Sequence, residues 1–136
     1  MLTSNRLCTN RAKKAKEPQS QNNKIKMKAI ICKSFGTIEN LVFEEIESPI
    51  PEPGQVLIRV AACGVNFPDT LIIQGKYQFK PAFPFSPGGE VAGVITKIGE
   101  NVKHLKVGDR VFSLTGHGGF AQEVIGEAMK TFPMPA

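Results

Sequence analysis

The sequence predicts a mainly β protein, a small and partly open antiparallel barrel or sandwich with one short helix. All thirteen glycines and nine of the ten prolines of the 136-residue chain lie within residues 27–136, between short apolar runs. Glycine and proline at such spacing are typical of short strands joined by turns. Strand and helix patterns do not alternate, which excludes a parallel doubly wound sheet. No apolar run approaches the roughly 18 residues that a membrane span needs, so none is expected.

The expected strands follow from the apolar runs and from the turn residues between them. The first two, at 28–33 and 41–47, end before a segment with proline at every second position, which stays extended and cannot donate into a central ladder. A Pro-Gly pair at 53–54 predicts the turn before the third strand. The other strands are expected at 55–65, 90–99, 108–112 and 119–125.

A short helix is expected at 69–73, between the third and fourth strands. Pro68 suits a first helical position, Asp69 stabilises the first turn electrostatically, and Gly75 closes the helix. Asn66 lies at the corner before the helix, with an amide that can both donate and accept. Residues 76–87 then form a loop rich in proline and phenylalanine.

Two glycine-containing turns are predicted to be structural. Gly88 and Gly89 permit close backbone approach before the strand that Glu90 begins, and Glu90 needs a partner if it is buried. Gly108 permits a positive φ angle, and Asp109 can accept backbone N–H bonds. We therefore expect both turns to shape the chain rather than to carry chemistry.

The net charge of +5 is concentrated at the start of the chain. Residues 1–26 hold seven Lys or Arg and one acid, whereas residues 27–136 hold ten bases and eleven acids. We expect a basic, disordered extension over 1–26 and a nearly neutral domain over 27–136. A mitochondrial presequence and a nucleic-acid-binding arm are the alternatives for the extension. Nucleic acid is not expected as a partner of the domain, because the basic charge lies outside it.

The sequence offers few residues for metal or acid–base chemistry. The three cysteines, at 8, 32 and 63, form no C-x-x-C pair, which disfavours zinc ribbons and disulfide scaffolds and favours a reducing compartment such as the cytoplasm. His104 has no second ligand at metal-binding spacing. His117 lies in a G-H-G-G segment that lacks the G-x-G-x-x-G pattern and the following helix of a phosphate loop. We expect a flexible hairpin loop there, with a general-base role for His117 as the lesser alternative.

Six motifs together resemble the medium-chain dehydrogenase/reductase superfamily, over residues 27–136. They occur in the family's order, as MKA at 27–29, PGQV at 53–56, GVNFPD at 64–69, PGGEVAG at 87–93, VGDRV at 107–111 and GGFAQE at 118–123. The resemblance is to the N-terminal GroES-like catalytic domain and implies its partly open β-barrel. The Rossmann domain that follows in the family is absent from these 136 residues, so we expect a chain truncated before the cofactor-binding domain.

The departures from the zinc enzymes of this superfamily are informative. Zinc alcohol dehydrogenases carry a cysteine at the corner where this chain has Asn66, and a histidine where it has Gly89. An amide and a glycine cannot replace thiolate and imidazole as zinc ligands, so no metal is expected. The pattern is similar to the zinc-free NADPH:quinone oxidoreductase branch.

That resemblance implies hydride transfer from NADPH to a quinone or an enone. It implies that Asn66 and Asp69 face the nicotinamide and substrate cleft, with Tyr77 near its mouth. Many quinone reductases have a tyrosine where this chain has Leu71, which removes a contact near the nicotinamide. The sequence singles out no catalytic acid or base. Without the Rossmann domain we expect the chain to be inactive alone, and a homodimer only where that domain is present. A stand-alone GroES-like binding module or a non-functional gene fragment is the alternative.

Overall fold

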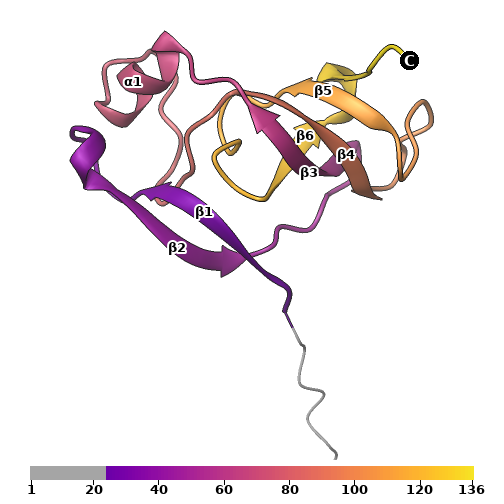
Figure 1. Cartoon of the computed structure of the whole chain (residues 1–136), viewed down its shortest axis with the longest axis horizontal. Helices are drawn as coiled ribbons and strands as arrows, with labels where there is room; N and C mark the ends of the chain where they lie inside the picture. Colours follow the sequence, from indigo (N-terminus) through magenta and orange to yellow (C-terminus); the bar gives the residue numbers. More distant parts are fainter. Residues whose placement is uncertain (1–23) are drawn as a thin grey trace, which may run out of the picture.

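The computed structural model describes residues 24–136, so the extension predicted over 1–26 lies almost entirely outside the described residues. Two antiparallel sheets dominate it (Figure 1). β1 (Lys26–Cys32) and β2 (Leu41–Glu47) form a hairpin. The five-stranded sheet has the order β6-β3-β4-β5-β7, with bounds Glu123–Glu127, Gln55–Cys63, Glu90–Ile98, Arg110–Leu114 and Thr131–Pro133. Three short helical segments complete the described chain, α1 (Phe67–Ile73) and the 3₁₀ turns η1 (Ile38–Asn40) and η2 (Ala128–Lys130).

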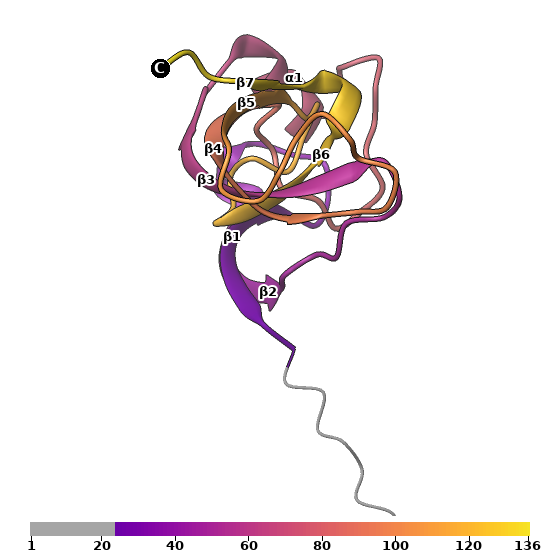
Figure 2. The ribbon, with the colours of Figure 1, turned by 90° about the vertical axis from the view of Figure 1, so that its right-hand side faces the viewer.

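The five-stranded sheet curls into a partly open barrel (Figure 2). The register of β3 against β4 shifts between Leu57 and Ile58 and again between Val60 and Ala62. Such bulges bend a strand and increase its twist. The curl brings β6 towards β5. Their closeness is seen at Gly126 of β6, where a Cβ would lie 2.9 Å from the hydroxyl oxygen of Ser113 in β5. The mainly β, partly open barrel expected from the sequence is confirmed.

One apolar core fills the barrel. Alternate residues of β4 are buried while the residues between them are more accessible, which is the pattern of a strand with one face inwards. The core side chains are all at most 5% exposed, and they are Val56, Ile58, Val91, Ile95, Leu105, Val111, Val124 and Ala128. Burying one valine or isoleucine side chain stabilises a fold by about 1.5–3 kcal/mol. The core therefore holds the sheet in its curled form.

A second, smaller core places α1 beside the hairpin. Cys32 at the end of β1 exchanges backbone bonds with Phe85, at 2.7 and 3.2 Å. Cys32, Phe85, Ile72 and Ile73 pack together, the last two being the buried face of α1. Residues 120–122 pair along the same free edge of β1. The hairpin, α1 and the loops around them therefore form one packed unit at an end of the barrel.

Several element boundaries differ from the sequence prediction. α1 begins at Phe67, because Asn66 is its N-cap residue. β3 ends at Cys63 rather than at 65. The strand expected at 108–112 lies at 110–114, since Gly108 (φ 92°) and its neighbour form a turn. The strand expected at 119–125 begins only at Glu123, because the preceding residues pair with β1.

Two kinds of element were missed altogether. β7 spans three residues, Thr131–Pro133, and pairs with β5. The 3₁₀ turns η1 and η2 are equally short. A three-residue strand carries no periodic pattern of its own, so only its pairing with a distant strand defines it.

Candidate functional site

Asp69 fixes the corner where the chain leaves β3 and enters α1. Its side chain is buried, and the Asn66 N–H donates to Oδ2 at 2.8 Å while the Gly88 N–H donates to Oδ1 at 3.0 Å. The Asp69 N–H donates in turn to the Asn66 carbonyl at 3.0 Å. Spacing of i and i+3 is what a helix N-terminus needs for reciprocal capping. One carboxylate therefore joins the start of α1 to the turn before β4.

The turn at Gly88 and Gly89 approaches neighbouring groups too closely for a side chain. Gly88 has a φ of 91°, and a Cβ there would lie 2.7 Å from the Cys63 sulfur. A Cβ on Gly89 would lie 3.0 Å from the Gly116 carbonyl oxygen. Both distances are below the 3.5–4.0 Å or so of ordinary van der Waals contact. The two glycine turns, at 88–89 and 116–119, are therefore packed directly against each other.

A cavity opens beside this corner, and we call it the Asn66 cavity. Its volume is about 580 Å³, and α1, the loop at 77–79, the two glycine turns and the adjoining ends of β4 and β5 surround it. Its polar side chains include Asn66, Glu90 and Tyr77. Asn66 Nδ2 donates to Glu90 Oε2 at 3.1 Å. This leaves the side-chain oxygen of Asn66 (Oδ1) and the other carboxylate oxygen of Glu90 (Oε1) as acceptors.

The cavity brings together three of the four cleft residues expected from the sequence. Asn66, Asp69 and Tyr77 all line it. Leu71 does not, because it follows Asp69 by two residues, which is more than half a helical turn, and so projects from another side of α1. Glu90, expected only to start a strand, contributes its carboxylate to the cavity and is exposed rather than buried.

Apolar residues of the cavity were missed by the sequence reasoning. Phe67, Phe79 and Leu114 line it, and all three are more than half exposed. A large apolar side chain beside a predicted turn could have marked each residue as a candidate for a binding surface, since exposed apolar clusters mark such surfaces. The sequence gives no sign, however, that positions 67, 79 and 114 meet.

Cys63 packs against the glycine turns, with its sulfur close to Gly88 and Gly119. Burial raises the pKa of its thiol, and the negative charge of Asp69 adds to this, as does that of Glu90 to a smaller extent. Its sulfur makes a weak contact with the Gly64 carbonyl at 3.6 Å. A thiol held protonated is a poor nucleophile and a poor metal ligand. Cys63 therefore serves packing under the glycine turns.

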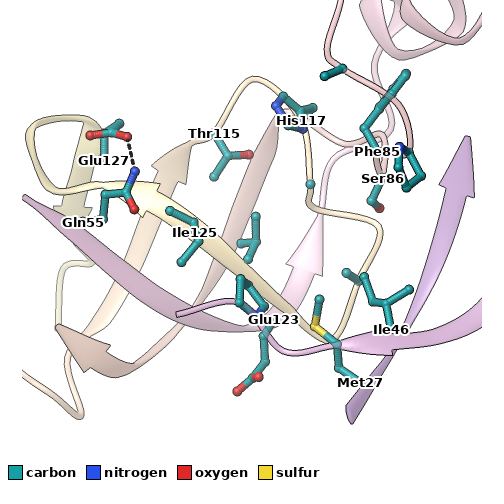
Figure 3. Close-up of a pocket in the computed structure, with 16 residues that line it drawn as sticks. Met27, Ile46, Gln55, Phe85, Ser86, Thr115, His117, Glu123, Ile125 and Glu127 are labelled. Atoms are coloured by element: carbon teal, nitrogen blue, oxygen red, sulfur yellow. Dashed lines mark hydrogen bonds between the residues drawn. The ribbon is translucent and has the colours of Figure 1, made fainter. Parts of the chain in front are cut away.

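A second cavity, of about 550 Å³, lies between the hairpin, β6 and the loop at 82–86 (Figure 3). We call it the His117 cavity. His117, Thr115 and Ser86 gather at one end of it, whereas Met27 and Ile46 line the side formed by the hairpin. Burial lowers the pKa of the His117 imidazole, so the ring is neutral near pH 7.

The remaining sequence candidates lie away from these cavities. Asp109 accepts the Lys106 backbone N–H at 3.0 Å and its ammonium group at 2.5 Å, within the turn at Gly108. His104 Nε2 lies 3.0 Å from the Ala128 carbonyl oxygen. Across residues 24–136, no group of three or more His, Cys, Asp or Glu side chains is placed to hold a metal ion. No helix in that range is long and apolar enough to cross a membrane.

The sequence model of the alcohol dehydrogenase GroES-like domain matches residues 52–136. This chain belongs to the GroES-like domain family. Quinone oxidoreductase of the rat is 43% identical to it over 111 residues, which are 80% of this chain and 34% of that protein. The GroES-like domain therefore spans about a third of the length of the curated relatives it matches.

Solved structures agree with this assignment. The human synaptic vesicle membrane protein VAT-1 homolog-like protein superposes with a TM-score of 0.77 at 32% identity, over 82% of this chain and 36% of that one. The mycobacterial protein Rv1454c, solved in complex with NADPH, superposes with a TM-score of 0.74 at 34% identity, over 80% of this chain and 34% of that one. The expected membership of the medium-chain dehydrogenase/reductase superfamily, through its N-terminal GroES-like domain, is confirmed.

Proposed function

We propose that this GroES-like domain forms the substrate side of a zinc-independent, NADPH-dependent reductase of quinones and related conjugated carbonyls. The Asn66–Glu90 pair in the Asn66 cavity is the observation that carries the proposal. An amide and a carboxylate share the polar corner of a largely apolar cavity. A zinc enzyme of the superfamily would have a thiolate in place of Asn66 and an imidazole in place of Gly89, the residue before Glu90. The similarity to quinone oxidoreductases supports the same reaction class.

The Asn66 cavity fits the nicotinamide end of NADPH. Its volume of about 580 Å³ lies within the range of about 300–1,000 Å³ of small-molecule sites. The Asn66 and Glu90 oxygens can accept from the N–H groups of a carboxamide, and the Tyr77 hydroxyl can donate to a carbonyl oxygen. NADPH, when bound, supplies the hydride. Phe67 and Leu114 would exclude water from the reacting groups.

Asp69 serves this site by positioning rather than by proton transfer. Both of its carboxylate oxygens already accept backbone N–H bonds, one from the helix start and one from the glycine turn. Protonating it would weaken the corner that holds Asn66. We therefore propose that the one proton that completes the reduction, after hydride transfer, comes from water.

A chimera tests this function directly. Residues 26–136 of this chain would replace the matched third of the rat quinone oxidoreductase, and NADPH oxidation would be followed at 340 nm with 2,3-dimethyl-1,4-naphthoquinone. That quinone carries methyl groups at both positions where a thiol could add, so the cysteines do not consume it. We expect quinone-dependent turnover, and a loss of about tenfold in kcat/KM for Asn66→Ala.

The control for the chimera is His104→Ala, which lies outside both cavities and should leave kcat/KM unchanged. A folded chimera that binds NADPH and yet does not reduce the quinone would contradict the proposed function. Full activity of the Asn66→Ala chimera would leave the fold assignment intact and remove the role given to the Asn66–Glu90 pair.

A further inference from the structure

His117 lies on a loop that the fold holds firmly. The Thr115 and Gly116 N–H groups both donate to the Gly89 carbonyl, at 2.9 and 3.2 Å, and the Gly118 N–H donates to the Ser86 carbonyl at 2.7 Å. The glycines on either side of His117 have φ angles of 77° and 99°, which other residues rarely adopt. The flexible hairpin loop expected from the sequence is therefore pinned on both sides of the imidazole.

The imidazole lies within a row of aromatic rings. Phe35 lies 4.7 Å from Phe83, Phe83 lies 5.6 Å from Phe85, and Phe85 lies 6.1 Å from His117, measured between ring centroids. On its other side His117 stacks on Phe79, at 5.9 Å and an interplanar angle of 27°. Phe79 lines the Asn66 cavity, and its side chain is 51% exposed. A large aromatic face is thus open to a ligand.

The ring therefore stands between the two cavities. His117 itself lines one of them, whereas its neighbour Gly116 and its stacking partner Phe79 line the other. No residue within 24–136 hydrogen-bonds to either ring nitrogen. No unbonded polar side-chain atom of that part of the chain is fully buried, so each ring nitrogen keeps some solvent-accessible surface. A neutral imidazole offers there one N–H donor and one acceptor.

We propose that His117 is a positioning residue for the substrate. Its imidazole N–H hydrogen-bonds a carbonyl oxygen of a flat aromatic quinone whose ring lies against Phe79. This inference rests on the proposed function and narrows its substrate class. Stacking on an aromatic face adds affinity beyond burial of apolar area, and an aliphatic enone cannot gain it. A fused aromatic quinone is therefore bound in preference to a small aliphatic enone.

The chain provides its own internal reference for a test. It has two histidines, and His104 lies outside both cavities. The imidazole signals of the 136-residue chain would be recorded by NMR at pH 7 during titration with 2,3-dimethyl-1,4-naphthoquinone. We expect the His117 signals to shift in a saturable way while those of His104 stay in place.

Substitutions at His117 separate its hydrogen bond from its packing. His117→Phe keeps a ring between Phe79 and Phe85 and removes the donor, so the quinone Kd should rise about fivefold. His117→Gln restores an N–H donor and should recover part of that loss. A merely structural ring would give the reverse order. Phe79→Leu should weaken binding of the naphthoquinone while leaving that of cyclohex-2-enone unchanged.

Three outcomes would overturn the inference. One is a Kd of His117→Phe within twofold of the wild-type value, and another is an equal shift of both histidines. The third is a quinone that shifts the Asn66 side-chain amide and leaves His117 unaffected. The chimera separates failure of this inference from failure of the proposed function. If the His117→Phe chimera turns over the quinone with the same KM as the unsubstituted chimera, the role of His117 is overturned and the proposed function stands. Absence of turnover in a folded, NADPH-binding chimera would overturn both.

Discussion

Asp69 connects three parts of the site through one buried carboxylate. It is 6% exposed, and its oxygens accept from the N–H groups of Asn66 and Gly88. A buried acceptor that is lost leaves an N–H group without a partner, which costs about 1–3 kcal/mol. The carboxylate therefore acts by holding the backbone of this corner in place, even though Asp69 lines the Asn66 cavity.

Asp69→Asn should lower the free energy of unfolding by about 2 kcal/mol, because an amide NH₂ would face one of the two backbone donors. Urea denaturation followed by circular dichroism measures this change. Asp109→Asn is the matched control, since Asp109 also accepts two N–H bonds but in a surface turn where water can replace them. Equal losses in the two variants would contradict the buried-clamp role of Asp69.

His117 should make the stability of the chain depend on pH. Burial lowers its pKa in the folded state below the ordinary value of about 6.5, so the unfolded state binds more protons in the interval between the two values. The stabilising contribution of the neutral His117 ring is then fully present above about pH 6.5, and it is lost as the pH falls through that interval. Urea midpoints between pH 7.5 and 5 should fall more steeply for the wild-type chain than for His117→Phe. An equal fall of the midpoint in the wild-type chain and in His117→Phe would contradict this origin of the pH dependence.

At the scale of elements, the pairing of β3 with β4 decides the curl of the sheet. Gly93 of β4 lies opposite Val60, next to the bulge in β3. A Cβ on Gly93 would lie 2.1 Å from the Arg59 carbonyl oxygen. The two backbones can approach this closely only without a side chain, and the bulge bends β3 at the same place.

Gly93→Ala should therefore destabilise the fold by about 3 kcal/mol, since the clash is with backbone that cannot move aside. Gly108→Ala is the matched control. Nothing lies within 4 Å of a Cβ at Gly108, and its φ of 92° alone should cost about 1 kcal/mol. Urea midpoints of the two variants measure the difference, and a smaller loss for Gly93→Ala would contradict the close approach of β3 and β4.

At the scale of the whole molecule, the chain spans about a third of the length of the curated relatives it matches, and the proposed function gives it only the substrate side of a site. Hydride transfer requires the reduced nicotinamide to be held against the substrate. The 136 residues contain no G-x-G-x-x-G loop between a strand and a helix, which is the usual cradle of a dinucleotide pyrophosphate.

We expect the 136-residue chain alone to give no quinone-dependent oxidation of NADPH, as measured by absorbance at 340 nm. The chimera described above serves as the positive control in the same assay. Turnover that increases in proportion to the concentration of the isolated chain would contradict this expectation. Binding of the quinone to the isolated chain without turnover would not contradict it, because residues of this chain line both cavities.

The sequence by itself determined the local features of this protein. Short apolar runs separated by Gly and Pro determined the strand content, and the Asn66 and Asp69 spacing of three residues determined the helix corner, because reciprocal capping acts within one turn of chain. The motif order determined the family. The positions of the glycine turns at 88–89 and 108 follow from the same local chemistry.

Only the tertiary structure decided which of these features meet. The Asn66–Glu90 bond joins residues 24 apart, and the stack of His117 on Phe79 joins two loops that have no periodic pattern. Leu71 falls outside the Asn66 cavity because the packing of Ile72 and Ile73 sets the rotation of α1. β7 exists because β5 pairs with it. Such contacts depend on the curl of the sheet, which arises from the sum of many long-range pairings and leaves no mark on any single segment.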